Sequence, residues 1–209
     1  MKPWLREIQY SFYLAVHPFK GFWGIKHEGA GSVRAATVLL VLYTLVSVLS
    51  AYFTGYLFSP NAAGEVQPAR QAFTILALFF GYCIANWAFT CLFDGEGTFA
   101  DIYRATGYAL LPLILTTALL IPMSNFFVME EQAFYTTISS LGAVWTAFLL
   151  LISVLVTHNY SLGKGLGMIL CIGFGMCVIA YIALLFFNLL QQMIGFVVIA
   201  ATEFTARYL

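Results

Sequence analysis

Five apolar runs, each long enough to cross a bilayer, constrain this chain more than any other feature. A membrane-spanning helix needs about 20 mostly apolar residues. Such runs occupy residues 35–58, 72–93, 105–127, 134–157 and 166 onward. The sequence therefore predicts an all-α fold, an integral membrane bundle of five transmembrane helices.

The composition of the chain indicates a surface that faces lipid. Of the 209 residues, 62% are hydrophobic and 9% are charged, whereas soluble domains carry about 25% charged residues. The formal net charge is zero, which gives no indication of a nucleic-acid partner. The lipid bilayer is thus the first partner that the sequence predicts.

The fifth run is unusual because it has no evident end before Glu203. It is too long for one crossing and too short for two crossings with a turn. We expect one helix that crosses the membrane over about 166–187 and extends to about residue 204. A bend at the membrane interface near Gln191 is the alternative.

The basic residues of the loops indicate an orientation. With the N-terminus inside, seven Lys and Arg residues fall in inside segments, and two, Arg70 and Arg207, fall outside. Cytoplasmic loops of membrane proteins carry the excess of basic residues. We therefore expect a cell-membrane protein with a cytosolic N-terminus and an extracytosolic C-terminus.

Residues 1–34 form a segment that precedes the membrane domain expected over 35–209. Apolar residues in this segment recur at steps of three and four, with basic and polar residues between them. This pattern is typical of an amphipathic helix, and Pro18 should break the helix at His17. The helix is expected in the headgroup layer or packed against the cytosolic ends of the spans, and both can hold together.

The stretch DGEGTFADIYRATGYALLP, residues 94–112, lies between the second and third runs. Asp94 and Glu96 beside glycines suggest a calcium loop, but the further oxygen ligands that such a loop needs do not follow. Thr98 and Asp101 have the spacing of a capping box at a helix N-terminus. We therefore expect a turn at 94–97 that reverses the chain, with the third helix starting at Asp101.

Three residues of this stretch are expected to form a structural joint in the third span. Gly107 allows a neighbouring helix to approach closely, and Tyr108 suits the membrane interface. Pro112 cannot donate a backbone hydrogen bond and should kink the helix about one turn inside the membrane.

The segment GTFADIYRATGYALLP resembles the start of the third span in the Yip family, five-span membrane proteins named for interaction with Ypt/Rab small GTPases. Its Gly-Tyr-x-Leu-Leu-Pro core carries most of the resemblance, and HPFKGFWGIKHEGAGSVRAA and HNYSLGKGLG resemble cytosolic segments of prokaryotic members. The Asp-Leu-Tyr-Gly-Pro motif of eukaryotic members does not precede the first run, which puts Rab binding in doubt. The resemblance implies a prokaryotic-type member, an integral membrane protein without a settled biochemical activity.

Neither the three histidines nor any catalytic motif indicates an enzyme or a metal site. His17, His27 and His158 fall on the predicted cytosolic side, but their spacing matches no zinc motif. Interfacial hydrogen bonding is the simpler role, and a zinc or pH-sensing cluster is the alternative. No catalytic motif occurs, and no Asp, Glu, Lys or Arg lies deep inside a run. We expect no catalytic residue, cofactor or metal, and no enzymatic activity.

These features favour a non-catalytic membrane scaffold or adaptor that presents a cytosolic face to a protein partner. The predicted face comprises the N-terminal helix and the loops 94–104 and 158–165. The candidate residues of this face and its supporting joint are Asp94, Glu96, Thr98, Asp101, Tyr103, Arg104, Gly107, Tyr108, Pro112, His17, His27 and His158. The alternative is a small transporter or an accessory subunit of a transporter complex. Pro112 and Pro122 would give it a hinge, whereas the lack of buried ionisable residues argues against it.

Overall fold

The computed structural model describes residues 3–55, 57–58 and 67–208, and within them every regular element is a helix. Two short helices, α1 (Pro3–Val16) and α2 (Pro18–His27), come first. The break between them lies at His17, as predicted. Proline lacks an N–H and disfavours helical backbone in the residue before it, so α1 ends there.

The predicted spans correspond to long apolar helices. They are α3 (Val33–Phe53), α4 (Pro68–Leu92), α5 (Phe99–Ala109) continued by α6 (Leu111–Ser124), α7 (Gln132–His158), which follows the 3-10 turn η1 (Met129–Glu131), and α8 (Leu162–Tyr208). Within the described residues, five helical segments are long and apolar enough to cross a membrane. The predicted all-α membrane bundle is confirmed. The first span ends earlier than expected, because the backbone becomes extended at Thr54.

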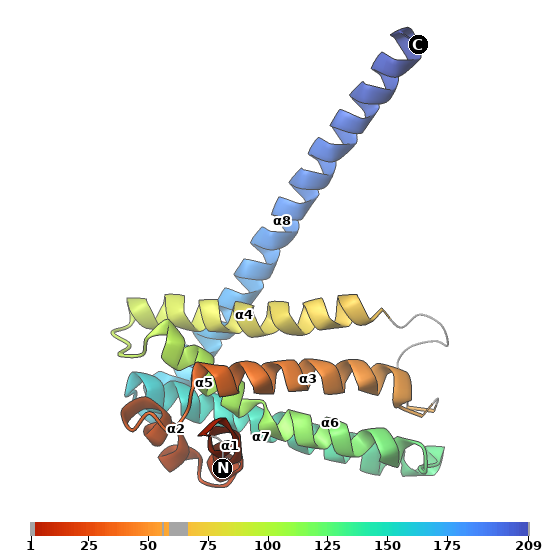
Figure 1. Ribbon diagram of the computed structural model, residues 1–209. Helices are drawn as coiled ribbons and strands as arrows, with labels where there is room; N and C mark the ends of the chain where they lie inside the picture. Colours follow the sequence, from red (N-terminus) through yellow and green to blue (C-terminus); the bar gives the residue numbers. More distant parts are fainter. Residues whose placement is uncertain (1–2, 56, 59–66, 209) are drawn as a thin grey trace.

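The third span, α5 with α6, lies at the centre of the bundle. Helices α3, α4, α6 and α7 run side by side, and α1 and α2 cover the end at which α5 begins (Figure 1). α5 packs against α3, α4 and α7, and α6 packs against α3 and α7. We call the end with α1, α2 and residues 93–98 the N-terminal end, and the other the opposite end.

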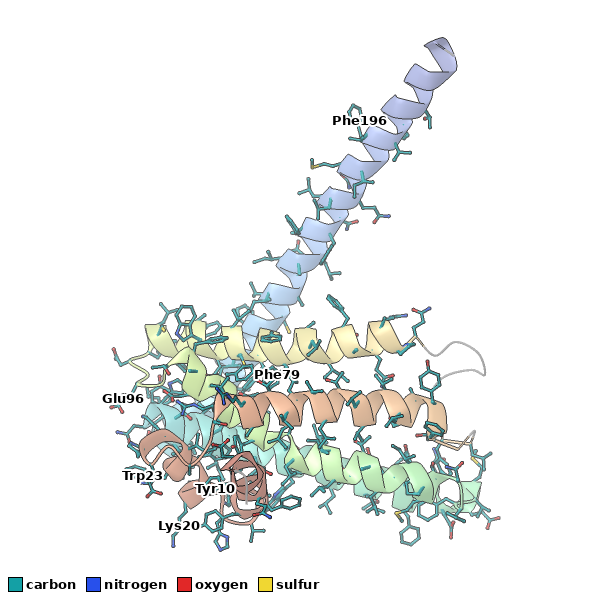
Figure 2. All side chains as sticks on the ribbon, in the orientation of Figure 1. Tyr10, Lys20, Trp23, Phe79, Glu96 and Phe196 are labelled. Atoms are coloured by element: carbon teal, nitrogen blue, oxygen red, sulfur yellow. The ribbon has the colours of Figure 1, made fainter. Side chains whose placement is uncertain are left out.

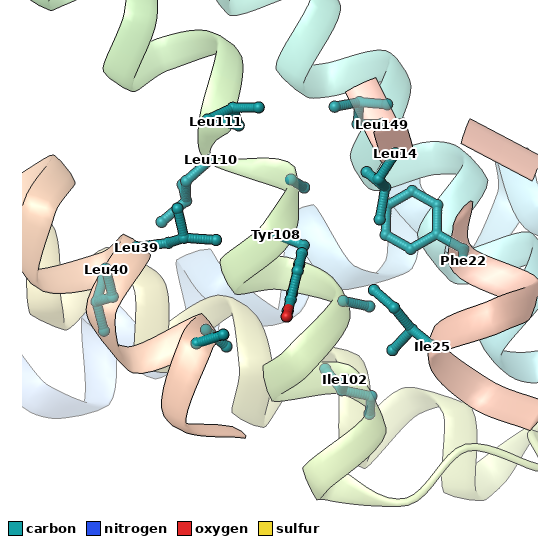
Figure 3. Packing of buried hydrophobic residues seen from close by; sticks show 14 of the residues in the cluster. Leu14, Phe22, Ile25, Leu39, Leu40, Ile102, Tyr108, Leu110, Leu111 and Leu149 are labelled. Atoms are coloured by element: carbon teal, nitrogen blue, oxygen red, sulfur yellow. The ribbon is translucent and has the colours of Figure 1, made fainter. Parts of the chain in front are cut away.

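The largest buried cluster lies near the N-terminal end, around Tyr108 (Figure 3). Leu14 of α1 and both Phe22 and Ile25 of α2 pack into it, so the N-terminal segment packs against the spans. The expected apolar face of this segment is divided, however. Phe12, Val16, Phe19 and Trp23 stay exposed, where the headgroup layer can cover them. Leu14, in contrast, is fully buried.

Helix α8 is continuous from Leu162 to Tyr208, so the alternative of a bend near Gln191 is wrong. It packs against α4 and α7 over its first part and then leaves the bundle at a steep inclination (Figure 1). Its apolar part, Leu162–Ile199, has 38 residues. At 1.5 Å per residue it measures about 57 Å, well above the ~30 Å hydrocarbon core. A steep tilt keeps more of such a helix within the bilayer.

Candidate functional site

The loop between α4 and α5 reverses the chain at the N-terminal end, as predicted. The N–H groups of Phe93 and Gly95 both donate to the carbonyl of Thr90, at 3.3 and 2.8 Å. They satisfy a carbonyl that the end of α4 leaves open. Asp94 has left-handed backbone with φ 57°, a conformation that Asp tolerates better than most residues.

Thr98 and Asp101 form the predicted capping box. The Asp101 N–H donates to Thr98 Oγ1 at 3.3 Å, and the Thr98 N–H donates to Asp101 Oδ2 at 3.0 Å. Two open N–H groups at the start of α5 are thereby satisfied. Arg104 pairs with the same carboxylate from the next turn of the helix. The helix begins at Phe99, slightly before the predicted start at Asp101.

His158, the last residue of α7, packs against the loop on its bundle side. Its side chain is 1% exposed, and its Nδ1 accepts from the N–H of Gly97 at 3.3 Å. In the neutral ring Nε2 therefore carries the proton. The Tyr160 ring stacks on the imidazole with centroids 5.6 Å apart, and its hydroxyl donates to the Phe93 carbonyl at 3.0 Å.

The two glycines of the loop are required by packing. A Cβ on Gly95 would lie 2.6 Å from His158 Nδ1, and a Cβ on Gly97 would lie 2.6 Å from Thr157 Cγ2. Side chains at these positions would push the loop off α7. The glycines therefore bring the backbone against the imidazole. Packing accounts for both glycines of the GEG sequence, so an ion-binding loop is not needed to explain them.

Contacts from α2 and α8 complete the site. Lys26 pairs with Glu96 at 3.4 Å, while the Glu96 side chain stays largely exposed at the outer edge of this end (Figure 2). The Lys164 ammonium lies over the Tyr160 ring at 4.4 Å, a cation–π contact. Burial, with a smaller contribution from the Asp94 carboxylate, raises the pKa of the Tyr160 hydroxyl. The hydroxyl therefore stays protonated and able to donate.

The structure has the close helix approach that was predicted at Gly107 in the third span. A Cβ on Gly107 would lie 2.7 Å from Ala36 Cβ and 3.0 Å from Ala36 Cα, so α5 and α3 touch nearly backbone to backbone. The chain breaks at Leu110, between α5 and α6, and Pro112 lies in the first turn of α6. The predicted kink is therefore a one-residue interruption at Leu110, which keeps right-handed backbone within the span Phe99–Ser124.

The two tyrosines of the third span differ in burial, because Tyr108 is fully buried and Tyr103 is half-buried. Tyr108 was expected at the membrane interface, but it is 0% exposed, with the Tyr10 ring edge-on at 6.5 Å. The expectation is wrong because α1 and α2 fold back over this end and cover it. The Tyr103 hydroxyl shares a 2.9 Å hydrogen bond with Thr37 Oγ1 on α3.

The three histidines do not come together. His17 is exposed and stacks on Tyr13 at 4.9 Å, and His27 is exposed and stacks on Trp23 at 3.8 Å. His158 is buried beneath the loop. In the described part of the chain, no three His, Cys, Asp or Glu residues are grouped so as to hold a metal ion. The zinc-cluster alternative thus gains no support.

Sequence reasoning missed the parts played by Lys26 and Tyr160. The sequence HNY at residues 158–160 could have indicated the position of Tyr160, because Asn159 ends α7 in left-handed backbone with φ 55°. Asparagine is common at such a helix end, and the turn directs the next ring back onto His158. Nothing local marks Lys26 as the partner of Glu96, because 70 positions separate them.

The comparison with family models matches residues 12–185 to the Yip1 domain. The chain belongs to the Yip1 family. It is a multi-pass membrane protein, in agreement with the five long apolar helical segments among the described residues. The searches of curated proteins and of solved structures gave no match. The Yip1 match includes the loop, both halves of the third span and the part of α8 that packs on the bundle.

Proposed function

We propose that this Yip1-family protein is a non-catalytic scaffold of the cell membrane that presents its N-terminal end to a cytosolic protein partner. The observation that carries the proposal is the construction of residues 93–98. This loop is fixed from α2, α4 and α7, yet it leaves Asp94 and Glu96 exposed. Loops positioned by a rigid framework often carry binding residues.

The rigidity of the loop favours binding, since little conformational entropy remains to be lost on association. Exposed carboxylates on such a loop would attract a basic surface of the partner and steer its approach. The outward aromatic side chains of α1 and α2 flank this end, and large aromatic residues are common in protein interfaces.

The use of the polar groups supports binding over catalysis. Asp101 caps α5, His158 accepts from the loop, and Tyr160 donates to the end of α4. Each of these groups stabilises the backbone around it.

Site-specific photo-crosslinking in cells tests this proposal. A photoreactive amino acid at position 94 should give a discrete protein adduct, and Glu96→Lys should weaken that adduct because it reverses the charge of the loop. Glu130→Lys is the matched control, because Glu130 is exposed at the opposite end. Equal adducts in both charge variants, or no adduct at position 94, would contradict the proposal.

The proposed orientation rests on the excess of basic residues in the inside loops. A reporter that is active only in the cytosol should work at residue 1 and after Lys164, and should be silent after Arg207. Activity after Arg207 would rule out a chain that crosses five times from a cytosolic N-terminus.

A small transporter, or an accessory subunit of one, remains the alternative function. The division of the third span between α5 and α6 supports it, since such a break can act as a hinge. In the described residues, however, no Asp, Glu, Lys or Arg is fully buried, whereas ion pathways rely on such residues. A transporter subunit as the protein crosslinked at position 94 would favour this alternative.

A further inference from the structure

A groove runs between α3 and α4, from the opposite end of the bundle towards its middle. The outer part has a volume of about 590 Å³, and the inner part has a volume of about 360 Å³. Ile75 of α4 lines both parts, so they adjoin. The groove is distinct from the loop site, which lies at the N-terminal end.

The outer part is polar, and its charge is positive. Hydroxyl and amide side chains of α3 and α4 line it, and Arg70 is the charged residue among the described lining residues. No ion pair of Arg70 is found in the described part of the chain. Gln71 Nε2 donates to the Ser47 carbonyl at 2.8 Å, which ties the two helices together beside the guanidinium.

The inner part is apolar and reaches the centre of the bundle. Side chains from every span line it, among them Leu40, Leu78, Phe79, Leu113, Leu150 and Met176. Phe79 lies between α4 and α3 in Figure 2. The groove therefore changes from polar to apolar along α4, which is the polarity order of a lipid molecule.

The depth of the two parts matches one leaflet. Arg70 lies in the first turn of α4, and Phe79 is about 14 Å further along the helix at 1.5 Å per residue. Half of the hydrocarbon core is about 15 Å thick. The guanidinium thus lies at the level of the headgroups when the apolar part lies among the acyl chains.

We propose that this groove is a binding site for a glycerophospholipid, with the phosphate on Arg70 and an acyl chain in the inner part. Arginine presents paired N–H donors that match phosphate oxygens. The hydroxyl and amide side chains of the lining make the surroundings of the phosphate polar, and the volumes are typical of ligand sites. A lipid held here differs from a lipid that merely coats the bundle, because charge and shape both fix its position.

Photo-crosslinking with a labelled lipid tests the site. The full chain is reconstituted in nanodiscs that contain phosphatidylglycerol with a photoreactive group in the acyl tail, and labelled peptides are mapped by mass spectrometry. Label should concentrate at Tyr43 and its neighbours on the groove. Arg70→Gln should lower this label about tenfold, the effect of losing a charged hydrogen bond. Arg34→Gln, which removes an exposed arginine outside the groove, should leave it unchanged.

A second variant separates lipid binding from loss of folding. Leu78→Trp fills the inner part while Arg70 is retained, and the Leu78 side chain is 57% exposed, so the fold should tolerate it. It should also lower the label at Tyr43. Even labelling of all outward helix faces, or equal labelling in parent, Arg70→Gln and Leu78→Trp, would overturn the proposal. Displacement of the lipid by inorganic phosphate would show a simple anion site and would also overturn it.

Discussion

The third and fifth spans have similar sequence signals but opposite roles. The fifth is the more apolar, yet only 11% of its most apolar stretch is buried inside the protein, against 44% for the third. In a bilayer, lipid covers apolar side chains as well as protein does, so hydropathy alone does not drive helices together. The core forms where small residues allow close packing.

The glycines show this difference at single positions. Gly107 of α5 touches the backbone of Ala36, whereas a Cβ on Gly173 of α8 would meet nothing within 4 Å. Gly107 therefore serves helix contact, whereas Gly173 has no such contact. Matched substitutions in the two spans test how far this comparison holds.

The largest expected effect comes from the buried tyrosine. Tyr108→Ala should lower the free energy of unfolding by about 3–5 kcal/mol, as for other large core side chains. Tyr181→Ala, at a side chain that is 62% exposed on α8, should change it by less than about 0.5 kcal/mol. Chemical unfolding in detergent measures both. Equal losses would contradict the central position assigned to the third span.

The helix contact should give the next effect. Gly107→Leu forces side-chain atoms into the backbone of α3 and should cost about 1–3 kcal/mol or more, with a lower yield of folded protein. Gly173→Leu is the matched control and should leave the thermal transition unchanged. If Gly107→Leu folds with full stability, the close contact between α5 and α3 is not needed.

The capping box should contribute less. Thr98→Val removes the side-chain acceptor at the start of α5 and should cost about 1 kcal/mol. The thermal transition in detergent measures this cost. Thr136→Val serves as its control, because the Thr136 hydroxyl only donates to carbonyls of its own helix. A cost at Thr98 no larger than at Thr136 would count against the cap.

The smallest effect is expected at the turn itself. Asp94→Asn should change stability by less than about 0.5 kcal/mol, since asparagine also tolerates left-handed backbone. The measurement is thermal stability with and without added calcium or zinc. Stabilisation of the parent protein by either ion, lost in Asp94→Asn, would restore the metal-loop interpretation.

Features that depend on neighbouring residues were predictable from the sequence. Thr98 and Asp101 are three positions apart and can cap the helix wherever it lies. Pro18 ends the first helix because of its own ring and its missing N–H. Contacts between distant segments were not predictable. Lys26 finds Glu96, and His158 finds Gly97, only after α2 and α7 have met the loop.

The length of the apolar runs determined that this chain is a membrane bundle of helices, because backbone groups in lipid must be hydrogen-bonded within each span. Run length and local breakers also located the spans approximately and the kink caused by Pro112, which the structure has at Leu110. Tertiary packing alone decided that α1 and α2 bury Tyr108 and that α8 leaves the bundle. It also placed Arg70 at the mouth of an apolar groove. An apolar side chain is covered equally well by lipid and by protein. Whether a helix face packs against protein or against lipid therefore depends on how closely the helix surfaces fit together.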